Sequence, residues 1–332
     1  MHSFPKDWDT LPWHLSEVAG LSIQNAWTVT RGCPDVTIAF VDRGFDLAHP
    51  RWEGRVSPFA RGGGWGDRFH GTACTGLALA DGGDGIWGVA PRCTFLPVLF
   101  DPEIDSQPLL EKRLEQVAEV CDVLAFCWSP FPGEHPLRPS LSRLLHSLAT
   151  VGGPKRRGVV LVASAGNHAS PVQTSQPVSW RHPRAGLLQT RGPVVNGYAT
   201  HPEILCVGAC NRAGSVSAYS NWGASVVLHA PSDDYDPLQP DRKRSEGLPT
   251  TAPGLGNGNG ARLRNFGGTS AAAALAAGVA GLMRSAAPDC TARQIRQILI
   301  DSAQPLTPTG GARRLQATSA VQTLQNLSKE CA

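Results

Sequence analysis

Residues 265–283 are the stretch that most restricts how this 332-residue chain can fold. They read NFGGTSAAAALAAGVAGLM, and no charge follows until Arg284. Alanine and leucine favour helix, and a helix that is apolar on every side has to be buried. We therefore expect a central helix that begins near Ser270, with unpaired N–H groups and the positive end of its dipole at that residue. A serine at such a position is usually only a cap, so a functional role needs support from elsewhere in the chain.

The composition is that of a globular protein with a small net charge. Hydrophobic residues make up 41%, and the net charge of +3 gives no reason to expect a nucleic acid or a membrane surface as partner. The apolar stretch above is too short and glycine-rich for a membrane span, and the N-terminus lacks a signal-peptide pattern. The nine cysteines form no CxxC pairs, and several fall in apolar runs, namely Cys121, Cys127, Cys206 and Cys210. We interpret them as reduced core residues and expect a cytoplasmic protein with no metal site of the zinc type.

Apolar runs of strand length alternate with amphipathic helical patterns along the chain. Strands are predicted at 36–41, 94–100, 123–127, 158–163, 203–209 and 225–230, and helices at 109–120, 140–151 and 291–303. Continuous apolar runs are typical of strands buried on both faces, and strand–helix repeats predict a parallel sheet covered by helices on both sides. The interpretation is a single α/β domain over residues 1–332.

Several segments are predicted to lie outside this repeat. Residues 1–30 are interpreted as an N-terminal arm laid over the core, and residues 304–332 as a C-terminal extension with a weak helix at 316–328. Residues 168–200 and 231–262, rich in polar residues, glycine and proline, are predicted to be irregular loops. Within the second loop, the run from Asp241 to Arg244 is interpreted as a solvated tip of the kind that proteases nick.

Four polar residues stand at the ends of the predicted elements. Asp42 directly follows the strand at 36–41, and Asn167 follows the strand at 158–163. His70 and Ser270 each open a helix of small residues. Because the carboxyl ends of parallel strands lie at one edge of a sheet, we expect the four side chains to meet there.

The chemistry of these four residues is complementary. A serine hydroxyl such as that of Ser270 is a weak nucleophile until a base, here His70, takes its proton. Asp42 would hold the imidazole in the right tautomer. Asn167 and the N–H of Ser270 would donate hydrogen bonds to a developing oxyanion. Each residue alone is a weak signal, and the four together predict a serine hydrolase.

Five segments resemble the subtilisin-like serine proteases, the subtilases. They read VTIAFVDRGFDLAHP, HGTACTG, VLVASAGN, ILCVGACNRAGSVSAYSNWG and GGTSAAAALAAGVAGL, and the resemblance spans roughly residues 11–303. It implies a subtilisin fold with a mostly parallel sheet of about seven strands, and peptide-bond hydrolysis without a required cofactor. It assigns Asp42, His70 and Ser270 to the catalytic triad, and Asn167 with Ser270 to the oxyanion hole.

The resemblance also implies where a substrate binds. The segment Phe126, Cys127, Trp128, Ser129 and Pro130 resembles the strand that pairs with the substrate backbone. With it, Ser164, Ala165 and Gly166 would wall the main specificity pocket. A peptide would then bind as an added strand, chiefly through its main chain. The expected partner is a protein or peptide substrate, and a proteinaceous inhibitor or regulator stays open; Glu134, near this strand, is a candidate for attracting basic residues.

Three positions depart from the family pattern. Arg43 replaces the usual Ser or Thr after the triad aspartate, and it either perturbs that carboxylate or points to solvent. Ala274 replaces the usual Pro, which should make the helix more regular. Arg51 stands where many members have a calcium-binding Asp, and a guanidinium cannot ligate calcium, whose ligands are oxygens. The usual structural calcium site is therefore expected to be lost, although Asp81 and Asp84 leave a cation site elsewhere open.

Two further points concern the kind of family member. Only ten residues precede the resemblance, and no prodomain of the type that secreted members carry is visible. Either a prodomain was removed from this chain, or the chain is an intracellular member that folds without one; the initial Met and the number of thiols favour the second. Two alternatives to an endopeptidase stay open. The same acyl-enzyme could react with an amine, in a peptide ligase or macrocyclase. Alternatively, the fold could be an inactive peptide-binding scaffold, for which Arg43 is the only support.

Overall fold

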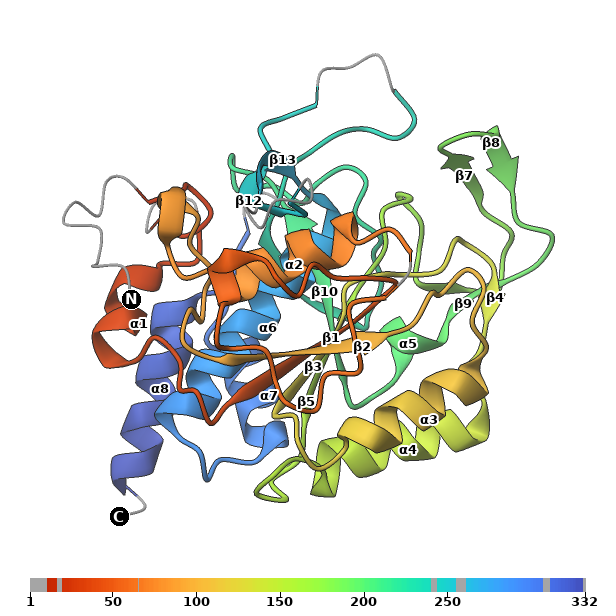
Figure 1. Cartoon of the computed structure of the whole chain (residues 1–332). Coiled ribbons are helices and arrows are strands. Elements are labelled where there is room, and N and C mark those ends of the chain that lie inside the picture. Colours follow the sequence, from red (N-terminus) through yellow and green to blue (C-terminus); the bar gives the residue numbers. More distant parts are fainter. Residues whose placement is uncertain are drawn as a thin grey trace.

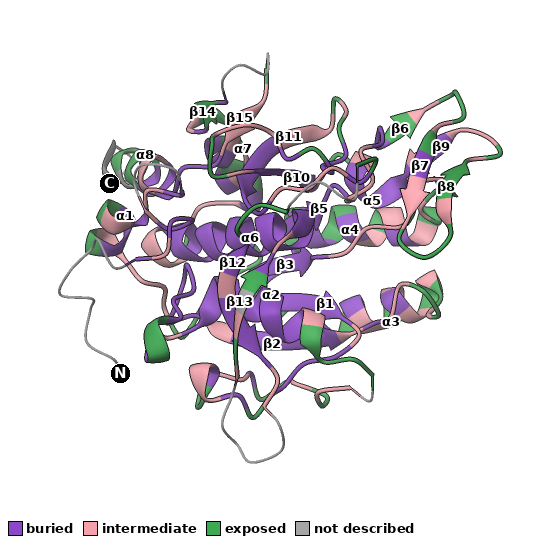
Figure 2. Cartoon of the chain, turned by 90° about the horizontal axis from the view of Figure 1, so that it is seen from above, coloured by how far each residue is buried: buried purple, intermediate pink, exposed green. Residues whose placement is uncertain are grey.

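A computed structural model describes residues 11–16, 20–64, 66–239, 244–254, 261–306 and 311–330. The strands of its main sheet are Thr37–Asp42 (β1), Thr94–Leu99 (β2), Val123–Phe126 (β3), Val160–Ser164 (β5), Ile204–Cys210 (β10), Val226–Pro231 (β11), Gln304–Pro305 (β14) and Arg313–Arg314 (β15). Figure 1 shows the strands β1, β2, β3, β5 and β10 in the middle of the molecule. The full order is β14-β15-β11-β10-β5-β3-β1-β2, which can be followed in Figure 2. All neighbours from β2 to β15 are parallel, and only β14 is antiparallel to its neighbour. The predicted α/β fold with a mostly parallel sheet is confirmed, with eight strands instead of about seven.

Helices cover both faces of this sheet. They are Ile23–Val29 (α1), Phe69–Leu79 (α2), Gln107–Val117 (α3), Pro139–Val151 (α4), Gly197–Thr200 (α5), Gly268–Ala286 (α6), Ala292–Asp301 (α7) and Ala317–Glu330 (α8), with 3₁₀ turns at Pro50–Trp52 and Gly83–Gly85. Ile38 and Phe40 of β1 belong to the hydrophobic core that contains α2 and α6, whereas Ala39 and Val41 belong to the core that contains α3 and α4. The alternation follows from the two-residue period of a strand.

α6 is the buried helix in the middle of the fold (Figure 2). Its residues are buried from Gly268 to Arg284, as its apolar sequence predicts. At its far end Arg284 donates to the carbonyl oxygen of Gly158 at 2.7 Å and pairs with Asp122 at 3.7 Å. Among the helices of the described chain, none is long and apolar enough to cross a membrane.

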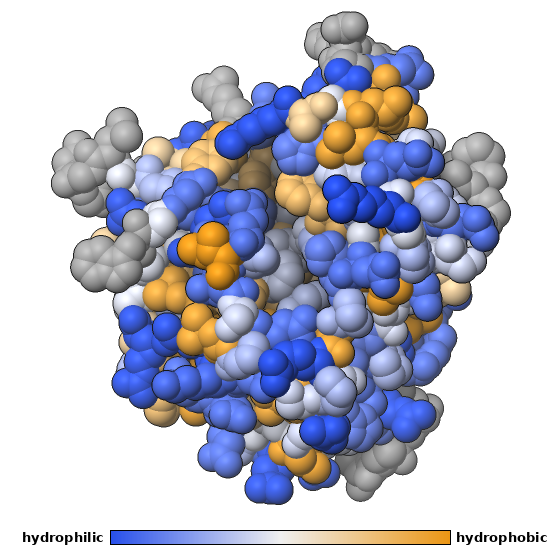
Figure 3. Space-filling model, turned by 90° about the vertical axis from the view of Figure 1, so that its right-hand side faces the viewer, coloured by the Kyte–Doolittle hydropathy of each residue, from blue (hydrophilic) through white to orange (hydrophobic). Residues whose placement is uncertain are grey.

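The prediction of an irregular loop over residues 168–200 is wrong. This segment holds Gln173–Thr174 (β6), Ser179–His182 (β7), Gly186–Gln189 (β8), Val194–Asn196 (β9) and α5. β7 and β8 form a hairpin, and β9 pairs with β6 and with Glu134–His135 (β4). These strands are short and partly exposed, so they lack a clear hydrophobic period. On this side of the molecule hydrophilic groups predominate, and hydrophobic groups form separate patches (Figure 3).

Residues 231–262 are likewise not one irregular loop. Leu248–Ala252 (β12) pairs antiparallel with Ala261–Phe266 (β13), and this ribbon lies over α2. Residues 304–332 are also more than an extension, because β14 and β15 complete the main sheet and α8 packs against α1 and α6. Within the predicted N-terminal arm, Trp13 and Trp27 are buried, whereas residues 1–10 lie outside the described chain.

Candidate active site

Asp42 and His70 are in direct contact at the edge of the main sheet. Asp42 is the last residue of β1 and is only 3% exposed, and His70 lies in the first turn of α2. The Nδ1 atom of His70 lies 2.6 Å from Oδ2 of Asp42, while the N–H of Arg43 donates to Oδ1 at 2.9 Å. Each carboxylate oxygen therefore has a partner, and the carboxylate is held facing the imidazole.

The pKa of His70 is raised above its ordinary value of 6.5. Burial alone would lower this pKa, because it disfavours the charged imidazolium. The charge of Asp42 and its hydrogen bond to the ring act in the opposite direction and together outweigh burial. His70 consequently takes up a proton more readily than a free imidazole, which suits a general base.

The guanidinium of Arg43 is paired with carboxylates of a neighbouring loop. Its Nη2 lies 3.3 Å from Oε1 of Glu103 and 3.9 Å from Oδ1 of Asp101. Burial would lower the pKa of Arg43, but the charges of Asp101 and Glu103 raise it. The cation is thus neutralised locally, and its effect on the pKa of His70 is smaller than that of Asp42.

The β12–β13 ribbon supports the helix that carries His70. Thr250 and Thr251 of β12 are buried, and each hydroxyl donates to a backbone carbonyl oxygen of α2 at 2.7 Å. Phe266, at the end of β13, packs against the His70 ring with 5.7 Å between ring centroids. The ribbon therefore fixes α2 and covers one side of the imidazole.

Ser270 lies in the first turn of α6, next to the residues that hold Asn167. The Oδ1 atom of Asn167 accepts hydrogen bonds from the N–H and the hydroxyl of Thr269, both at 2.8 Å. A Cβ at Gly268 would lie 3.0 Å from Nδ2 of Asn167, and the φ of +79° there also favours glycine. The amide of Asn167 is thus held against the start of α6 with its NH₂ group left as a donor.

Two donors at this helix end have no acceptor within the described chain, namely the N–H of Ser270 and Nδ2 of Asn167. Such donors, at the positive end of a helix dipole, are suited to bind an anion. The hydroxyl of Ser270 also makes no hydrogen bond to a described residue. The packing of α2 against α6 brings the helices of His70 and Ser270 together without a hydrogen bond between these side chains. Catalytic hydrogen bonds are often long until substrate binds.

The predicted substrate-binding segments lie side by side beyond the ends of β3 and β5. The hydroxyl of Ser129 lies 3.4 Å from the carbonyl oxygen of Ala165. Three of the predicted residues are half-exposed, namely Trp128, Ser129 and Pro130, and five are buried, namely Phe126, Cys127, Ser164, Ala165 and Gly166. The buried side chains support this surface from below, which leaves contact with a ligand to the backbone and to the half-exposed residues.

A hollow of about 300 Å³ lies beside this segment, and we call it the Trp128 hollow. Its lining includes Phe100, Asp105, Trp128, Pro130, Glu134 and Tyr198. The Trp128 ring packs against Tyr198 and Phe100, with centroids 5.0 and 5.6 Å away, and its indole N–H donates to a carbonyl oxygen of β1. The hollow therefore combines a rigid aromatic wall with the carboxylates of Asp105 and Glu134.

One cluster in the described chain offers three possible metal ligands. These are Asp42, His70 and Cys74, whose ligand atoms lie within 4.8 Å of one another. Burial raises the pKa of the Cys74 thiol, and its hydrogen bond to Cys127 adds to the effect, so the thiol stays protonated. Because Nδ1 of His70 is already bonded to Asp42, the cluster suits proton transfer better than metal binding.

Arg51 lies between the two carboxylates for which a cation site was left open. Its Nη1 is 3.3 Å from Oδ1 of Asp81, and its Nη2 is 3.7 Å from Oδ2 of Asp84. The side chain is only 12% exposed, and a Cβ at Gly83 would lie 0.8 Å from Nη1. The guanidinium therefore fills the space within this turn.

Three polar residues that the sequence analysis did not select organise the site. Thr269 accepts an N–H from the chain after β5 at 3.0 Å while it donates to Asn167. Asn221 bonds the backbone on both sides of Asn167 through its amide. Asp233 accepts the N–H of Gly268 at 2.9 Å. Thr269 and Asn221 lie inside segments that carry the family resemblance, whereas no local pattern marks Asp233.

A carboxylate–imidazole pair at the carboxyl edge of a parallel sheet, whose helix packs against one with a serine in its first turn, agrees with the arrangement of serine hydrolases. Residues 34–324 match the model of the subtilase family, Peptidase S8. The chain therefore belongs to this family of serine proteases.

Relatives in this family share a modest part of their sequence with the chain. The Calcium-dependent protease of Nostoc sp. is 29% identical over 335 residues, which cover 90% of this chain and 47% of that protein. The Dibasic-processing endoprotease of Schizosaccharomyces pombe is 25% identical over 331 residues, which cover 93% of this chain and 41% of that protein. The chain thus spans about half the length, or less, of these relatives.

Solved structures show the same fold. A protease from Pseudoalteromonas arctica superposes with a TM-score of 0.68 at 20% identity, covering 95% of this chain and 97% of that one. The prenylagaramide maturation protease PagA superposes with a TM-score of 0.65 at 22% identity, covering 91% of this chain and 98% of that one. These likenesses confirm the subtilisin-like architecture predicted from the sequence.

Proposed function

We propose that the chain is a serine endopeptidase that hydrolyses peptide bonds through an acyl-enzyme, with Asp42, His70 and Ser270 as its triad. The observation that carries this proposal is the 2.6 Å contact between Nδ1 of His70 and Oδ2 of Asp42, in a chain of the subtilase family. An imidazole that donates from Nδ1 to a carboxylate presents Nε2 as a proton acceptor. We assign the hydroxyl that it activates to Ser270, on the helix that packs against α2.

In the proposed mechanism Oγ of Ser270 attacks the carbonyl carbon of the scissile bond while Nε2 of His70 takes the hydroxyl proton. Asp42 stabilises the imidazolium, which then gives the proton to the leaving amine. Water, activated by the same base, hydrolyses the acyl-enzyme. The oxyanion of each tetrahedral intermediate accepts hydrogen bonds from the N–H of Ser270 and Nδ2 of Asn167, a contribution of about 3 kcal/mol per donor.

A peptide substrate would bind in an extended conformation along Trp128, Ser129 and Pro130. Main-chain pairing of this kind discriminates little between peptide sequences. Sequence specificity therefore has to come from pockets that bind the side chains of the peptide. The Trp128 hollow, with its aromatic wall and the carboxylates of Asp105 and Glu134, fits a side chain with an apolar stem and a basic end. A preference for lysine or arginine near the scissile bond is therefore part of the proposal.

The cellular location and other partners stay proposals as well. Most cysteines of the described chain are buried thiols outside any disulfide, among them Cys121, Cys206 and Cys210. Free buried thiols are typical of proteins in reducing compartments, which supports the predicted cytoplasmic location. A proteinaceous regulator would have to occupy the same substrate-binding segments.

Product mass distinguishes the proposed hydrolysis from ligation. When a proteome-derived peptide library is incubated with the full chain, we expect pairs of products whose summed mass exceeds that of the parent peptide by one water. The residues around the cleaved bonds then report the specificity. Products that have lost a water on ring closure would instead support a ligase or macrocyclase. Retained peptide binding without any turnover would support an inactive scaffold.

We further propose that Arg51 replaces a structural cation at the turn of Asp81 and Asp84. A relative is named a calcium-dependent protease, so the two proteins would differ at this point. The support is the pairing of the buried guanidinium with both carboxylates. Oxygen ligands already paired with arginine are poor ligands for calcium.

The melting temperature in calcium and in EDTA tests this proposal. We expect the two values to agree within about 2 °C, since a ligand that does not bind the native state does not stabilise it. Arg51→Ala should lower the melting temperature by about 2–6 °C, because it removes a partly buried ion pair. Arg212→Ala, which removes an exposed pair with Glu246, is the matched control. A large drop in EDTA would reveal a calcium site in the chain.

A further inference from the structure

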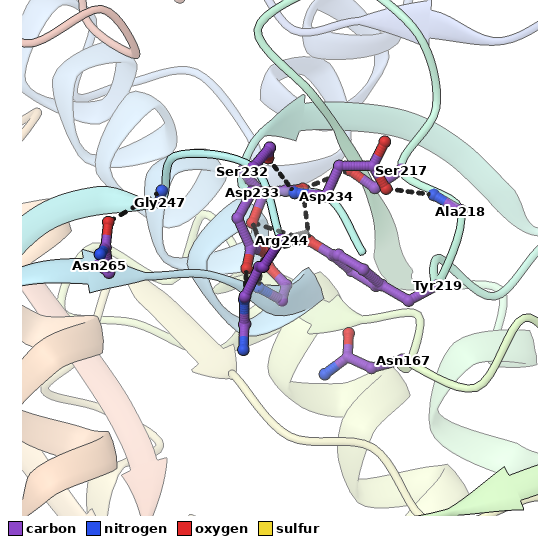
Figure 4. Close-up of polar contacts among 12 residues, drawn as sticks. Asn167, Ser217, Ala218, Tyr219, Ser232, Asp233, Asp234, Arg244, Gly247 and Asn265 are labelled. Atoms are coloured by element: carbon purple, nitrogen blue, oxygen red, sulfur yellow. Dashed lines mark hydrogen bonds and ion pairs between the residues drawn. The ribbon is translucent and has the colours of Figure 1, made fainter. Parts of the chain in front are cut away.

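Asp233 is a buried carboxylate behind the turn that leads to Ser270. It lies two residues after β11 and is 1% exposed. Its Oδ1 accepts hydrogen bonds from the N–H of Gly268 and the hydroxyl of Tyr219, both at 2.9 Å. Its Oδ2 pairs with Nε of Arg244. Figure 4 shows Arg244 and Tyr219 meeting at Asp233.

The N–H that Asp233 accepts belongs to the first residue of α6. The preceding cap residue, Gly267, has no side chain to accept it, so a carboxylate from the end of β11 takes that role. A Cβ at Gly267 would lie 2.0 Å from Oδ1 of Asp233, which shows how closely the carboxylate packs on this turn. The hydroxyl of Ser232 donates to the carbonyl oxygen of Gly268 at 2.9 Å. Both backbone groups of Gly268 are thus fixed by the two residues that follow β11.

The next residue, Thr269, is fixed from the other side by Asn167. The position of Ser270 therefore depends on two side chains from different strands, Asn167 after β5 and Asp233 after β11. A carboxylate is the stronger acceptor of the two, and the positive end of the helix dipole favours its charge. Asp233 is therefore well suited to fix the first residue of the helix.

Arg244 neutralises Asp233 from the surface. Its side chain is 58% exposed, and its guanidinium lies 4.6 Å above the ring of Tyr235, which stacks on Tyr219. Within the run from Asp241 to Arg244, interpreted as a solvated tip, Arg244 is exposed but is also paired with Asp233, whereas residues 241–243 lie outside the described chain. The ion pair with Arg244 holds Oδ2 of the buried Asp233 carboxylate in place.

We propose that Asp233 is a positioning residue for the nucleophile and that Arg244 controls it from the surface. The inference rests on the proposed role of Ser270. Asp233 sets the place of the Ser270 hydroxyl and N–H through Gly268, and it touches no reacting atom itself. A small displacement of the nucleophile lowers the rate of acylation without altering the distant peptide-binding segment, so kcat and not KM carries the effect.

The test compares Asp233→Asn, Arg244→Ala and Arg244→Lys with the wild-type chain. The measurements are kcat and KM on a peptide substrate and the rate of fluorophosphonate labelling, on samples shown to be folded by circular dichroism. We expect Asp233→Asn and Arg244→Ala to lower kcat and the labelling rate about 10- to 100-fold, with KM unchanged within about twofold. Arg244→Lys keeps the cation and should recover most of the loss.

Arg212→Ala is the matched control, because it also removes an exposed arginine that is paired with a carboxylate. Arg212 pairs with Glu246 at 2.9 Å, and both side chains are more than half exposed. We expect this variant to match the wild type in kcat, KM and labelling rate. Arg244 is itself exposed, so its variants keep the test valid even where Asp233→Asn does not fold.

Wild-type rates in folded Asp233→Asn and Arg244→Ala would overturn the inference. A loss confined to KM, or one shared by Arg212→Ala, would overturn it too. Failure of the proposed function gives a different result, because the wild-type chain would then not be labelled, or labelling would persist in Ser270→Ala.

Discussion

Replacing Ser270 by alanine is expected to abolish labelling by a fluorophosphonate probe and to lower kcat by about 10⁴- to 10⁶-fold. In the proposed mechanism the Oγ atom forms the covalent bond to the acyl group, a role that the alanine side chain cannot take. The fold should be preserved, because the serine hydroxyl makes no hydrogen bond within the described chain and alanine suits a helix of alanines. We therefore expect the melting temperature to change little.

Ser285→Ala is the matched control for this variant. Ser285 lies near the other end of the same helix and donates to the carbonyl oxygen of Gly281 at 2.7 Å. Its replacement removes the same atom and should leave labelling at the wild-type rate. Persistent labelling of Ser270→Ala, or equal loss in both variants, would contradict the assignment of the nucleophile.

Asp42→Asn is expected to lower kcat by about 10⁴-fold. The neutral amide can donate to Nδ1 of His70, so the ring would keep its proton on Nε2, where the base is needed. The imidazolium that forms during the reaction would also lose its charge partner across the 2.6 Å contact. Steady-state kinetics on a peptide substrate measure the loss, and circular dichroism verifies the fold.

The pH dependence gives a second readout for the same variant. A general base has to be unprotonated, so kcat/KM should fall as the pH drops through the pKa of His70. In the wild type that pKa is raised, so the midpoint of this fall should lie above pH 6.5. Asp42→Asn removes the charge that raises the pKa, so the remaining activity should extend to lower pH. Asp101→Asn removes the charge of a partner of Arg43 and keeps a side-chain oxygen for the N–H of Glu103, so it should keep both the rate and the profile. An unshifted profile in Asp42→Asn would contradict the role of His70 as base.

The elements that carry the predicted triad and oxyanion residues could be predicted because their signals are local. The apolar run of β1 ends at Asp42, and His70 and Ser270 lie in the first turns of the small-residue helices α2 and α6. Hydrophobic period and helix propensity act over a few residues, so they can be read directly from neighbouring positions. The parallel topology then places these ends at one edge.

The supports of the site could not be predicted in this way. Thr250 and Thr251 are polar residues in a segment rich in glycine and proline, yet both are buried because they bond to the backbone of α2. The sequence predicts only that Arg51 cannot ligate calcium. Its pairing with Asp81 and Asp84 depends on how two separate segments of the chain meet. Polar burial depends on partners that are remote in sequence.

The sequence by itself determined the α/β class, the central buried helix and the four residues expected to carry the chemistry. Hydrophobic patterns with the period of a helix or a strand can be recognised from residues that are close together in the chain. Only the tertiary structure decided how these residues are held. It placed Asp233 on the N–H of Gly268, 35 positions away, and Arg244 on Asp233. The physical reason is that a hydrogen bond or ion pair is specified by the geometry of two chain segments, and no local pattern encodes which segments meet.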